Sequence, residues 1–390
     1  MVLTNKQQEG LRIAVERYKT GEKYTCISGY AGSGKTTLVQ FIIEALGVDL
    51  NEVAYAAFTG KAAEVLRQKG CPNACTVHKL LYRARPLSNG KFVFTKRDVL
   101  DYKVVVVDEV SMLSGELWNI LMGHNVYVIA CGDPMQLPPV DKSNACTVLD
   151  QPHVFLDEIM RQAQESEIIR LSMDIRAGRP LSRFSGKDVY VIGPNDLNGG
   201  MLPWADQILV GTNAKRREIN ALMRTGRSAS LEVGDKIICG RNCWDIVDNL
   251  GENALVNGTI GFVTDVTKVE QRYPDPTLPR VPLYLTGFTS SFVGTYSTVP
   301  IDQNTILKGE KTLTPQQEAK FYRNKRLSLY PMPIEFDYGY AITCHRAQGS
   351  QWNNVFVCEE NFPNDRNDHK RWLYTAVTRA AQKLILMQRI

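Results

Sequence analysis

The segment that most constrains the fold is the octet G-Y-A-G-S-G-K-T at residues 29–36. It follows a short apolar strand pattern at residues 24–27 and leads into a helical pattern that starts at Thr37. In such a strand–loop–helix unit, glycines let backbone N–H groups surround phosphate oxygens at the positive end of the helix. We therefore expect a P-loop that binds a nucleoside triphosphate. The expected contacts are Gly32, Ser33, Gly34, Lys35, Thr36 and Thr37.

Two carboxylates complete the pattern of an ATP-hydrolysing site. Residues 102–107 (Y-K-V-V-V-V) predict a strand buried on both faces of a parallel sheet, and Asp108 and Glu109 follow it directly. Lys35 is expected on the β- and γ-phosphates, while Thr36 and Asp108 hold Mg²⁺ and Glu109 polarises the attacking water. A second apolar strand, at residues 126–131, leads to Gln136, which is placed to touch the γ-phosphate.

Composition restricts the class of protein without naming a partner. The 390 residues are 44% hydrophobic and 22% charged, enough for two or three domains. No apolar run approaches a membrane span and the first residues lack the apolar core of a signal peptide, so a cytoplasmic protein is expected. A net charge of +5 permits a polyanionic partner, and the nine cysteines are expected to be reduced thiols. Neither Cys71/Cys75 nor Cys239/Cys243 has the spacing of a zinc ribbon.

Eight ordered segments together resemble the conserved motifs of superfamily 1 helicases, and specifically those of the RecD/Dda-like 5′-to-3′ branch, superfamily 1B. They are residues 3–7 (glutamine motif), 58–63 (Ia), 76–81 (Ib), 108–112 (II), 132–140 (III), 156–162 (IV), 340–350 (V) and 373–380 (VI), besides the P-loop itself. The series spans nearly the whole chain. The resemblance implies two RecA-like parallel-sheet domains with ATP between them.

The resemblance also implies roles for individual residues. Gln7 would read adenine, Gly349 would lie at the nucleotide, and Arg161 and Arg379 would meet the charge that develops on the γ-phosphoryl group. A further group would face single-stranded DNA: Thr59, Gly60, Lys61, His78, Asn213, Thr343 and His345. For the histidines, a capping or core role is the alternative.

The chain is expected to divide into domains as these relatives do. Residues 1–145 would form the first RecA-like domain, and 146–230 with 336–390 the second. Asn89-Gly90 is a strong hairpin signal, and it predicts a β-hairpin "pin" at about residues 82–100 with Phe92 and Phe94 on one face. Those two rings would meet the duplex or cover the core beneath the hairpin. Residues 231–335 resemble an SH3-like barrel insertion, with a glycine-punctuated hairpin at 255–263.

The sequence therefore predicts an ATP- and Mg²⁺-dependent helicase that works as a monomer. The resemblance implies that it moves 5′ to 3′ on single-stranded DNA and acts at single-strand/duplex junctions. One alternative is a nucleic-acid-stimulated ATPase that translocates or remodels without separating strands. RNA is an alternative to DNA as the strand along which the protein moves, because no residue pattern in the sequence recognises the 2′-hydroxyl. A small-molecule kinase is disfavoured, because kinases lack the second RecA-like half.

Overall fold

The structure is a computed structural model that describes residues 3–68, 70–86, 92–138, 146–160, 165–251, 254–290, 294–324 and 326–389. The chain divides into two compact units. The first comprises Met1–Leu81, Arg97–Arg216 and Ile342–Ile390, and the second comprises Tyr82–Lys96 and Arg217–Ala341. Each unit is thus assembled from segments that are distant in the sequence.

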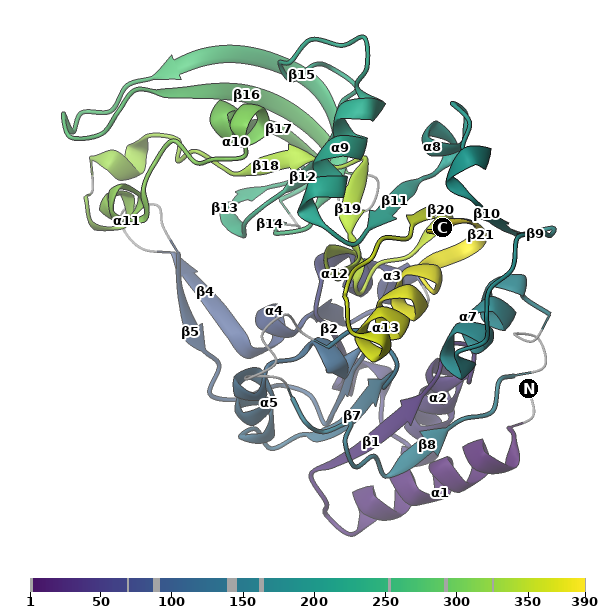
Figure 1. Ribbon diagram of the computed structural model, residues 1–390. Coiled ribbons are helices and arrows are strands. Elements are labelled where there is room, and N and C mark those ends of the chain that lie inside the picture. Colours follow the sequence, from purple (N-terminus) through teal and green to yellow (C-terminus); the bar gives the residue numbers. More distant parts are fainter. Residues whose placement is uncertain are drawn as a thin grey trace. The chain divides into compact units, whose positions relative to one another are not determined.

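The P-loop lies on the first of two largely parallel sheets in the first unit (Figure 1). Its strands run in the order β3-β2-β6-β7-β1-β8, with parallel pairing throughout. Valine, isoleucine and alanine dominate the buried strand positions, as expected for strands covered on both faces. The elements of this half are α1 (Asn5–Lys19), β1 (Tyr24–Gly29), α2 (Lys35–Leu46), β2 (Val53–Ala57), α3 (Gly60–Gln68), β3 (Ala74–Thr76), α4 (Val77–Leu81), β6 (Val104–Val107), α5 (Gly115–Met122), β7 (Tyr127–Gly132) and β8 (Val154–Leu156).

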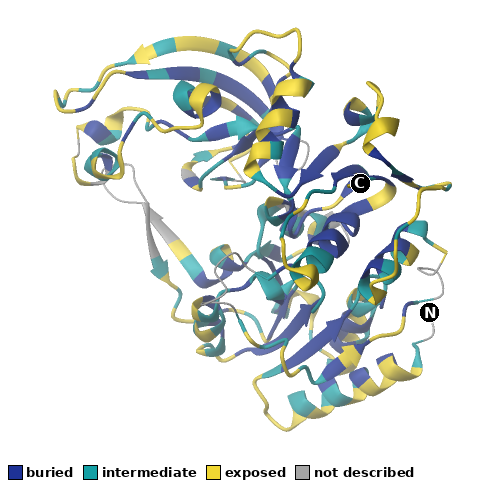
Figure 2. Ribbon diagram, in the orientation of Figure 1, coloured by how far each residue is buried: buried dark blue, intermediate teal, exposed yellow. Residues whose placement is uncertain are grey.

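Local signals fix the helices that cover this sheet. Thr4 caps α1: its hydroxyl accepts the Gln7 N–H, and the Gln7 side chain accepts the Thr4 N–H at 3.0 Å. α2 ends at Gly47, whose φ of 64° lies in the left-handed region. The two helices pack together beside β1 and β8, where Figure 2 shows their inner faces buried and the outer face of α1 exposed.

The second sheet of the same unit has the order β19-β11-β20-β21-β10-β9. The pairs β11/β20, β20/β21 and β10/β21 are parallel, and the edge strand β9 is antiparallel to β10. Residues 372–377, the last half of α13, are buried. The elements are α7 (Glu167–Ala177), β9 (Phe184–Ser185), β10 (Val189–Ile192), α8 (Met201–Trp204), β11 (Gln207–Val210), β19 (Ala341–Thr343), α12 (Cys344–Ala347), β20 (Trp352–Cys358), α13 (Arg366–Val377) and β21 (Ala380–Met387). The helix α9 (Asn213–Met223) begins in this unit, but most of its residues belong to the second unit.

These sheets confirm the prediction of an α/β fold with parallel sheets, but one predicted boundary is misplaced. β8 pairs with β1 in the first sheet, so the first half extends past residue 145, where it was expected to end. The sequence between β7 and β8 contains prolines and polar residues that look like a linker. The strand β8 has only three residues, Val154–Leu156, and so short an apolar run cannot be recognised from its periodicity as a strand of the preceding sheet.

The second unit contains an antiparallel sheet of order β17-β16-β15-β12-β18. Its edge strand β17 also hydrogen-bonds to the segment that leads into β18: Asp302 N donates to Ile334 O at 2.9 Å, and Ile334 N donates to Pro300 O at 2.8 Å. The sheet therefore bends back on itself around a buried aromatic core that includes Tyr284 and Phe288. The elements are β12 (Lys236–Cys239), β13 (Cys243–Val247), β14 (Ala254–Leu255), β15 (Ile260–Gln271), β16 (Val281–Ser290), β17 (Gly294–Asp302), α10 (Gln303–Lys308), α11 (Pro315–Arg323) and β18 (Phe336–Tyr338).

Two details of the predicted insertion are wrong. Residues 255–263 do not form a hairpin, because β14 pairs with β13 while β15 pairs with β12 and β16. The insertion also continues beyond residue 335, since β18 at Phe336–Tyr338 pairs with β12. Glycine spacing marked a turn correctly but could not indicate which strands the flanking segments join. The SH3-like nature of the sheet stays a prediction.

A hairpin stands where the sequence predicts the pin. β4 (Tyr82–Pro86) and β5 (Phe92–Lys96) are antiparallel, with Tyr82 opposite Lys96 and Pro86 opposite Phe92. The Asn89-Gly90 turn lies outside the described residues, as do the side chains of Phe92 and Phe94. The hairpin belongs to the second unit by its packing.

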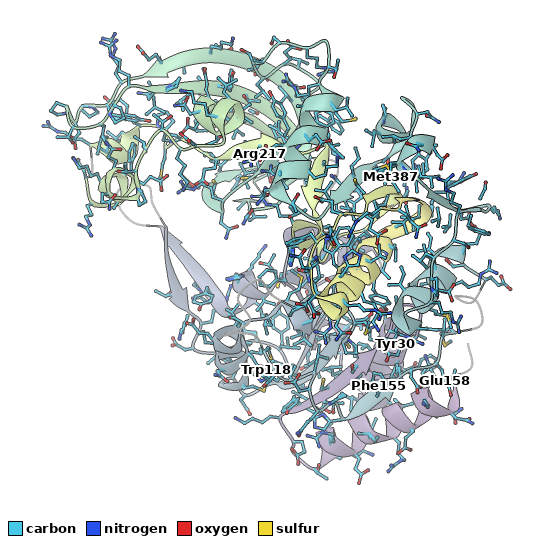
Figure 3. The ribbon with its side chains drawn as sticks, in the orientation of Figure 1. Tyr30, Trp118, Phe155, Glu158, Arg217 and Met387 are labelled. Carbon is cyan, nitrogen blue, oxygen red and sulfur yellow. The ribbon has the colours of Figure 1, made fainter. Side chains whose placement is uncertain are left out.

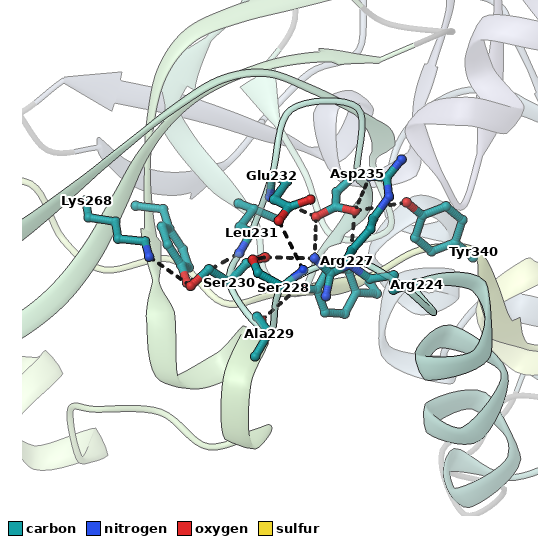
Figure 4. Close-up of polar contacts among 12 residues, drawn as sticks. Arg224, Arg227, Ser228, Ala229, Ser230, Leu231, Glu232, Asp235, Lys268 and Tyr340 are labelled. Carbon is teal, nitrogen blue, oxygen red and sulfur yellow. Dashed lines mark hydrogen bonds and ion pairs between the residues drawn. The ribbon is translucent and has the colours of Figure 1, made fainter.

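The buried carboxylate of Asp235 connects the beginning and the end of the segment 217–341 in the second unit (Figure 4). Asp235 is fully buried and binds Arg224 through both oxygens, at 3.0 and 2.9 Å. Arg227 and the Tyr340 hydroxyl also donate to Asp235, at 2.8 and 3.1 Å. The arginines precede the sheet and Tyr340 follows it, so this carboxylate joins the two ends of the inserted segment.

Among the helices of the described ranges, none combines the length and apolar character that crossing a bilayer requires.

Candidate nucleotide-binding and active site

The P-loop connects β1 to α2 and has the backbone that a phosphate cradle requires. Gly32 and Gly34 have φ values of 77° and 78°, which side-chain-bearing residues rarely adopt. Gly34 caps α2 without a side-chain hydrogen bond, so the first amides of the helix are turned towards the loop. Lys35 Nζ donates to Gly29 O at 2.7 Å and to Tyr30 O at 3.0 Å. The ammonium group therefore lies across the loop.

Tyr30 at the tip of the P-loop is held by two neighbours. Its ring lies edge-on to Phe155, with 5.3 Å between centroids, and Figure 3 shows the two side chains together. The Arg176 guanidinium carbon, from α7, lies 3.8 Å from the centre of the Tyr30 ring. This cation–π contact ties the loop to the second half of the unit.

Gln7, predicted to read adenine, is buried against the P-loop. Its side chain is 1% exposed, and Nε2 donates to the carbonyl oxygens of Ser33 and Gly34 at 3.3 and 3.4 Å. Its oxygen is the one that accepts the Thr4 N–H. Both ends of the amide are thus used within the protein, where they stabilise the loop backbone.

The two carboxylates follow β6 at the edge of the first sheet beside the loop. Asp108 Oδ1 accepts the Glu109 N–H at 3.0 Å. Glu109 has a φ of 52° and is the one non-glycine residue with positive φ in the described parts of the chain. Such a backbone costs about 1–3 kcal/mol and tends to persist where function requires it. It turns the Glu109 side chain towards Arg379.

Arg379 reaches Glu109 from the second half of the unit. Its Nη1 lies 3.1 Å from Glu109 Oε1, and its side chain is 6% exposed. The same guanidinium donates to Ser350 O at 3.3 Å and to Thr375 O at 3.1 Å. The other predicted arginine, Arg161, lies outside the described residues. One predicted arginine therefore has a defined place in the site.

Residues 133–137, which follow β7, are hydrogen-bonded to residues of the second sheet's half of the first unit. Leu137 N donates to Thr375 Oγ1 at 2.9 Å, and Leu137 O accepts from Gln348 Nε2 at 2.6 Å. Asp133, 3% exposed, accepts the Tyr374 hydroxyl at 2.7 Å. Burial raises the pKa of Asp133 above its ordinary value, although Lys35 and the Tyr374 hydroxyl act in the opposite direction.

Several polar atoms at this junction are buried without a hydrogen-bond partner in the described part of the chain. They are Ser33 Oγ, Glu109 Oε2 and Gln136 Oε1. Buried polar atoms usually have hydrogen-bond partners, so these three atoms are suited to contact a polar ligand or water. A triphosphate with its metal fits this set: amides, Lys35 and Arg379 suit phosphate oxygens, and the Thr36 hydroxyl and Asp108 carboxylate are the oxygen ligands that Mg²⁺ prefers.

Gly349 brings a third element to the same place. Its φ is 71°, and a Cβ atom there would lie 3.0 Å from Thr59 Oγ1 and 3.3 Å from Glu109 Oε2. Thr59 is held in turn, because its hydroxyl accepts the Ala62 N–H at the start of α3. Gly349, predicted as a nucleotide contact, thus meets both a catalytic candidate and a candidate DNA contact.

The remaining candidate DNA contacts occupy short helices at strand ends. Gly60 begins α3, His78 lies in α4, and Asn213 begins α9 with its side chain on Arg216 at 3.2 Å. Thr343 ends β19 and His345 lies in α12. Burial lowers the pKa of both histidines, so at neutral pH they are suited to stacking and hydrogen bonding rather than to phosphate charge. The side chain of Lys61 is outside the described part.

Comparisons with known proteins agree with this layout. Residues 3–188 match the model of an AAA domain, and residues 338–387 match that of a UvrD-like helicase C-terminal domain. The ATP-dependent RecD2 DNA helicase of Deinococcus radiodurans is 27% identical over 400 aligned positions, covering 93% of this chain and 46% of that protein. The ATP-dependent DNA helicase dda of phage T4 is 30% identical over 192 positions, covering 45% of this chain and 43% of that protein.

The chain is thus similar in sequence to helicases of the RecD2, dda and PIF1 kinds. It spans about half the length of the curated relatives named above. Among solved structures, Bacteroides Pif1 helicase in complex with ADP-AlF3 and ssDNA has a TM-score of 0.54 at 18% identity, covering all of this chain and 93% of that one. Candida albicans Pif1 helicase has a TM-score of 0.51 at 19% identity, with 100% and 95% coverage. These structures share the fold.

Sequence reasoning missed the side chains that join the motifs to one another. Asp133, Gln348, Tyr374 and Thr375 all lie inside segments that matched helicase motifs, but none was named as a site residue. The available signal was that each is a polar residue inside a segment that resembles a helicase motif. Their pairing depends on contacts across more than 200 residues of sequence.

Proposed function

We propose that this chain is an ATP- and Mg²⁺-dependent DNA helicase that translocates 5′ to 3′ on single-stranded DNA and separates duplex. The observation that carries the proposal is the ion pair between the partly buried Glu109 and the buried Arg379, 3.1 Å apart, beside the P-loop. Hydrolysis requires a polarised water and a positive charge that reaches the γ-phosphoryl group, and these two side chains supply both. The relatives named RecD2 and dda are ATP-dependent DNA helicases.

In the proposed reaction the P-loop amides and Lys35 bind the phosphates, with Gly32, Ser33, Gly34, Thr36 and Thr37 around them. Thr36 and Asp108 hold Mg²⁺, which neutralises phosphate charge. Glu109 accepts the proton of the attacking water, Gln136 contacts the γ-phosphate, and Arg379 stabilises the charge that develops there. Arg161 has the same proposed role as Arg379.

The proposed track is single-stranded DNA along Thr59, Gly60, Lys61 and His78 in the first half and Asn213, Thr343 and His345 in the second. The position of Thr59 beside Gly349 and Glu109 supports this track, because a DNA strand bound at Thr59 would lie close to the residues proposed to act on the nucleotide. A Pif1 relative of the same fold was solved with ssDNA. The 5′-to-3′ polarity rests on the RecD/Dda-like resemblance, and we propose action as a cytoplasmic monomer on the same ground.

The β4–β5 hairpin is proposed as the pin at the junction, and the bent sheet of the second unit as an SH3-like insertion. If Phe92 and Phe94 part the duplex, changing both to Ala should lower the number of base pairs unwound per ATP while DNA-stimulated hydrolysis persists. Unchanged unwinding per ATP would remove that role and leave the rings as cover for the hairpin.

The first test is ATP hydrolysis with and without single-stranded DNA, with single-stranded RNA in a parallel series. The proposal predicts strong DNA stimulation that is lost when Mg²⁺ is chelated. Hydrolysis without strand separation would favour the alternative of a translocating or remodelling ATPase. Hydrolysis that ignores both nucleic acids would contradict either reading.

A further inference from the structure

The Tyr374 hydroxyl joins the P-loop to Asp133. The Ala31 N–H, at the tip of the loop, donates to the hydroxyl oxygen at 2.8 Å, and the hydroxyl donates to Asp133 Oδ2 at 2.7 Å. Tyr374 is 1% exposed and Asp133 is 3% exposed. A side chain of α13 therefore bridges two segments of the first half in a place from which water is excluded.

The chemistry of the hydroxyl allows one arrangement. A phenol has a single proton to donate, and here that proton goes to the carboxylate while a lone pair receives the backbone amide. Burial, followed by the charge of Asp133, raises the pKa of Tyr374, so the group stays protonated at any physiological pH. The Tyr374 hydroxyl therefore keeps its proton, and it donates that proton to Asp133 in the structure.

Arg379 follows the same end of α13, just after the C-cap residue Thr378. Thr378 Oγ1 donates to Tyr374 O at 2.9 Å, and Arg379 Nε donates to Thr375 O at 3.1 Å. The guanidinium is thus bound to the backbone of the helix turn that contains Tyr374. Fixing the hydroxyl against the P-loop fixes the distance from Arg379 to the phosphate cradle.

We propose that Tyr374 is a positioning residue for ATP hydrolysis, acting through Arg379 by holding the end of α13 against Ala31 and Asp133. The inference rests on the proposed ATPase function. A phosphate bound in the loop and an arginine bound to the helix then keep a constant separation, and displacements of about 1 Å in such geometry can cost a hundredfold in rate.

The test is Tyr374→Phe, which keeps the buried ring and removes the bridge. We expect kcat for DNA-stimulated ATP hydrolysis to fall about 10- to 100-fold, while the dissociation constant of a fluorescent ADP changes less than about threefold, because ADP does not need Arg379. Tyr127→Phe is the matched control: Tyr127 is also buried, and its hydroxyl binds Thr25 and Ala14 O away from the loop. It should leave kcat unchanged. Thermal unfolding of both variants checks folding.

A double-mutant cycle with Arg379→Ala decides whether Tyr374 acts through the arginine. If it does, Tyr374→Phe should produce no further loss of kcat in the Arg379→Ala background. An equal loss in both backgrounds, a kcat within about twofold of wild type, or a loss of ADP binding without a change in kcat would each overturn the inference. A wild-type protein without DNA-stimulated hydrolysis would instead refute the proposed function and the inference with it.

Discussion

Because Glu109 and Arg379 form an ion pair, the substitution Glu109→Gln should strengthen ATP binding and slow ATP turnover. Glu109→Gln removes the carboxylate charge that binds Arg379 in the structure. The γ-phosphate then recruits the guanidinium without competing against a carboxylate, so ATP should bind more tightly. Turnover should fall by about 10²- to 10⁴-fold, because the amide cannot accept the proton of the attacking water.

The size of the binding effect follows from the geometry of the pair. Two unit charges 3.1 Å apart attract by roughly 5 kcal/mol at an effective dielectric constant of about 20. Most of this gain is cancelled by the cost of removing both groups from water, which leaves about 1–2 kcal/mol. Because about 1.4 kcal/mol is a factor of ten, the dissociation constant for ATP should fall about tenfold.

The assay compares a non-hydrolysable ATP analogue with ADP in equilibrium binding, and single-turnover hydrolysis with single-stranded DNA present. ADP has no γ-phosphate, so its affinity should change much less than that of the analogue. Glu44→Gln is a matched control, since Glu44 is exposed near the far end of α2 and carries the same charge. Equal tightening of ADP and ATP analogue, or no tightening of either, would refute the competition argument.

Three further predictions concern the P-loop, the buried Asp235 and the His369–Glu359 hydrogen bond. Lys35→Ala should abolish hydrolysis, because the P-loop loses its charge on the β- and γ-phosphates, and retained turnover would contradict the P-loop assignment. Asp235→Asn should lower the free energy of unfolding by about 3–5 kcal/mol by leaving Arg224 buried without its counter-charge, whereas Glu270→Gln in an exposed pair should cost less than about 1 kcal/mol in urea unfolding. The hydrogen bond to Glu359 raises the pKa of His369 above 6.5. The native state therefore binds more protons, and the stability that wild type gains over His369→Gln should be full below pH 6.5 and disappear as pH rises through the raised pKa, as measured by unfolding at several pH values.

The sequence could predict the parts of the site that are local in the chain. The P-loop and the Asp108-Glu109 pair each sit in a short segment whose strand and helix context is visible, and the structure places them as those segments indicate. Arg379 followed from the family resemblance. The bridge from Ala31 through Tyr374 to Asp133 could not be predicted, because its members are 241 and 343 residues apart and no local pattern pairs them.

The errors in the fold have a similar cause. β8 has three residues, and its membership of the first sheet depends on pairing with β1 rather than on its own pattern. The turn at residues 256–259 is correctly marked by glycine, but its flanking strands pair with different neighbours. Local propensity gives the position of an element, whereas partner choice is set by packing.

The proposed helicase activity is tested most directly by ATP-driven unwinding of matched duplexes that carry either a 5′ or a 3′ single-stranded DNA tail, with Lys35→Ala as the inactive control. A 5′-to-3′ helicase should separate strands from the 5′ tail and not from the 3′ tail. Unwinding from the 3′ tail alone would contradict the proposed polarity, and no unwinding from either tail despite DNA-stimulated hydrolysis would contradict the helicase assignment.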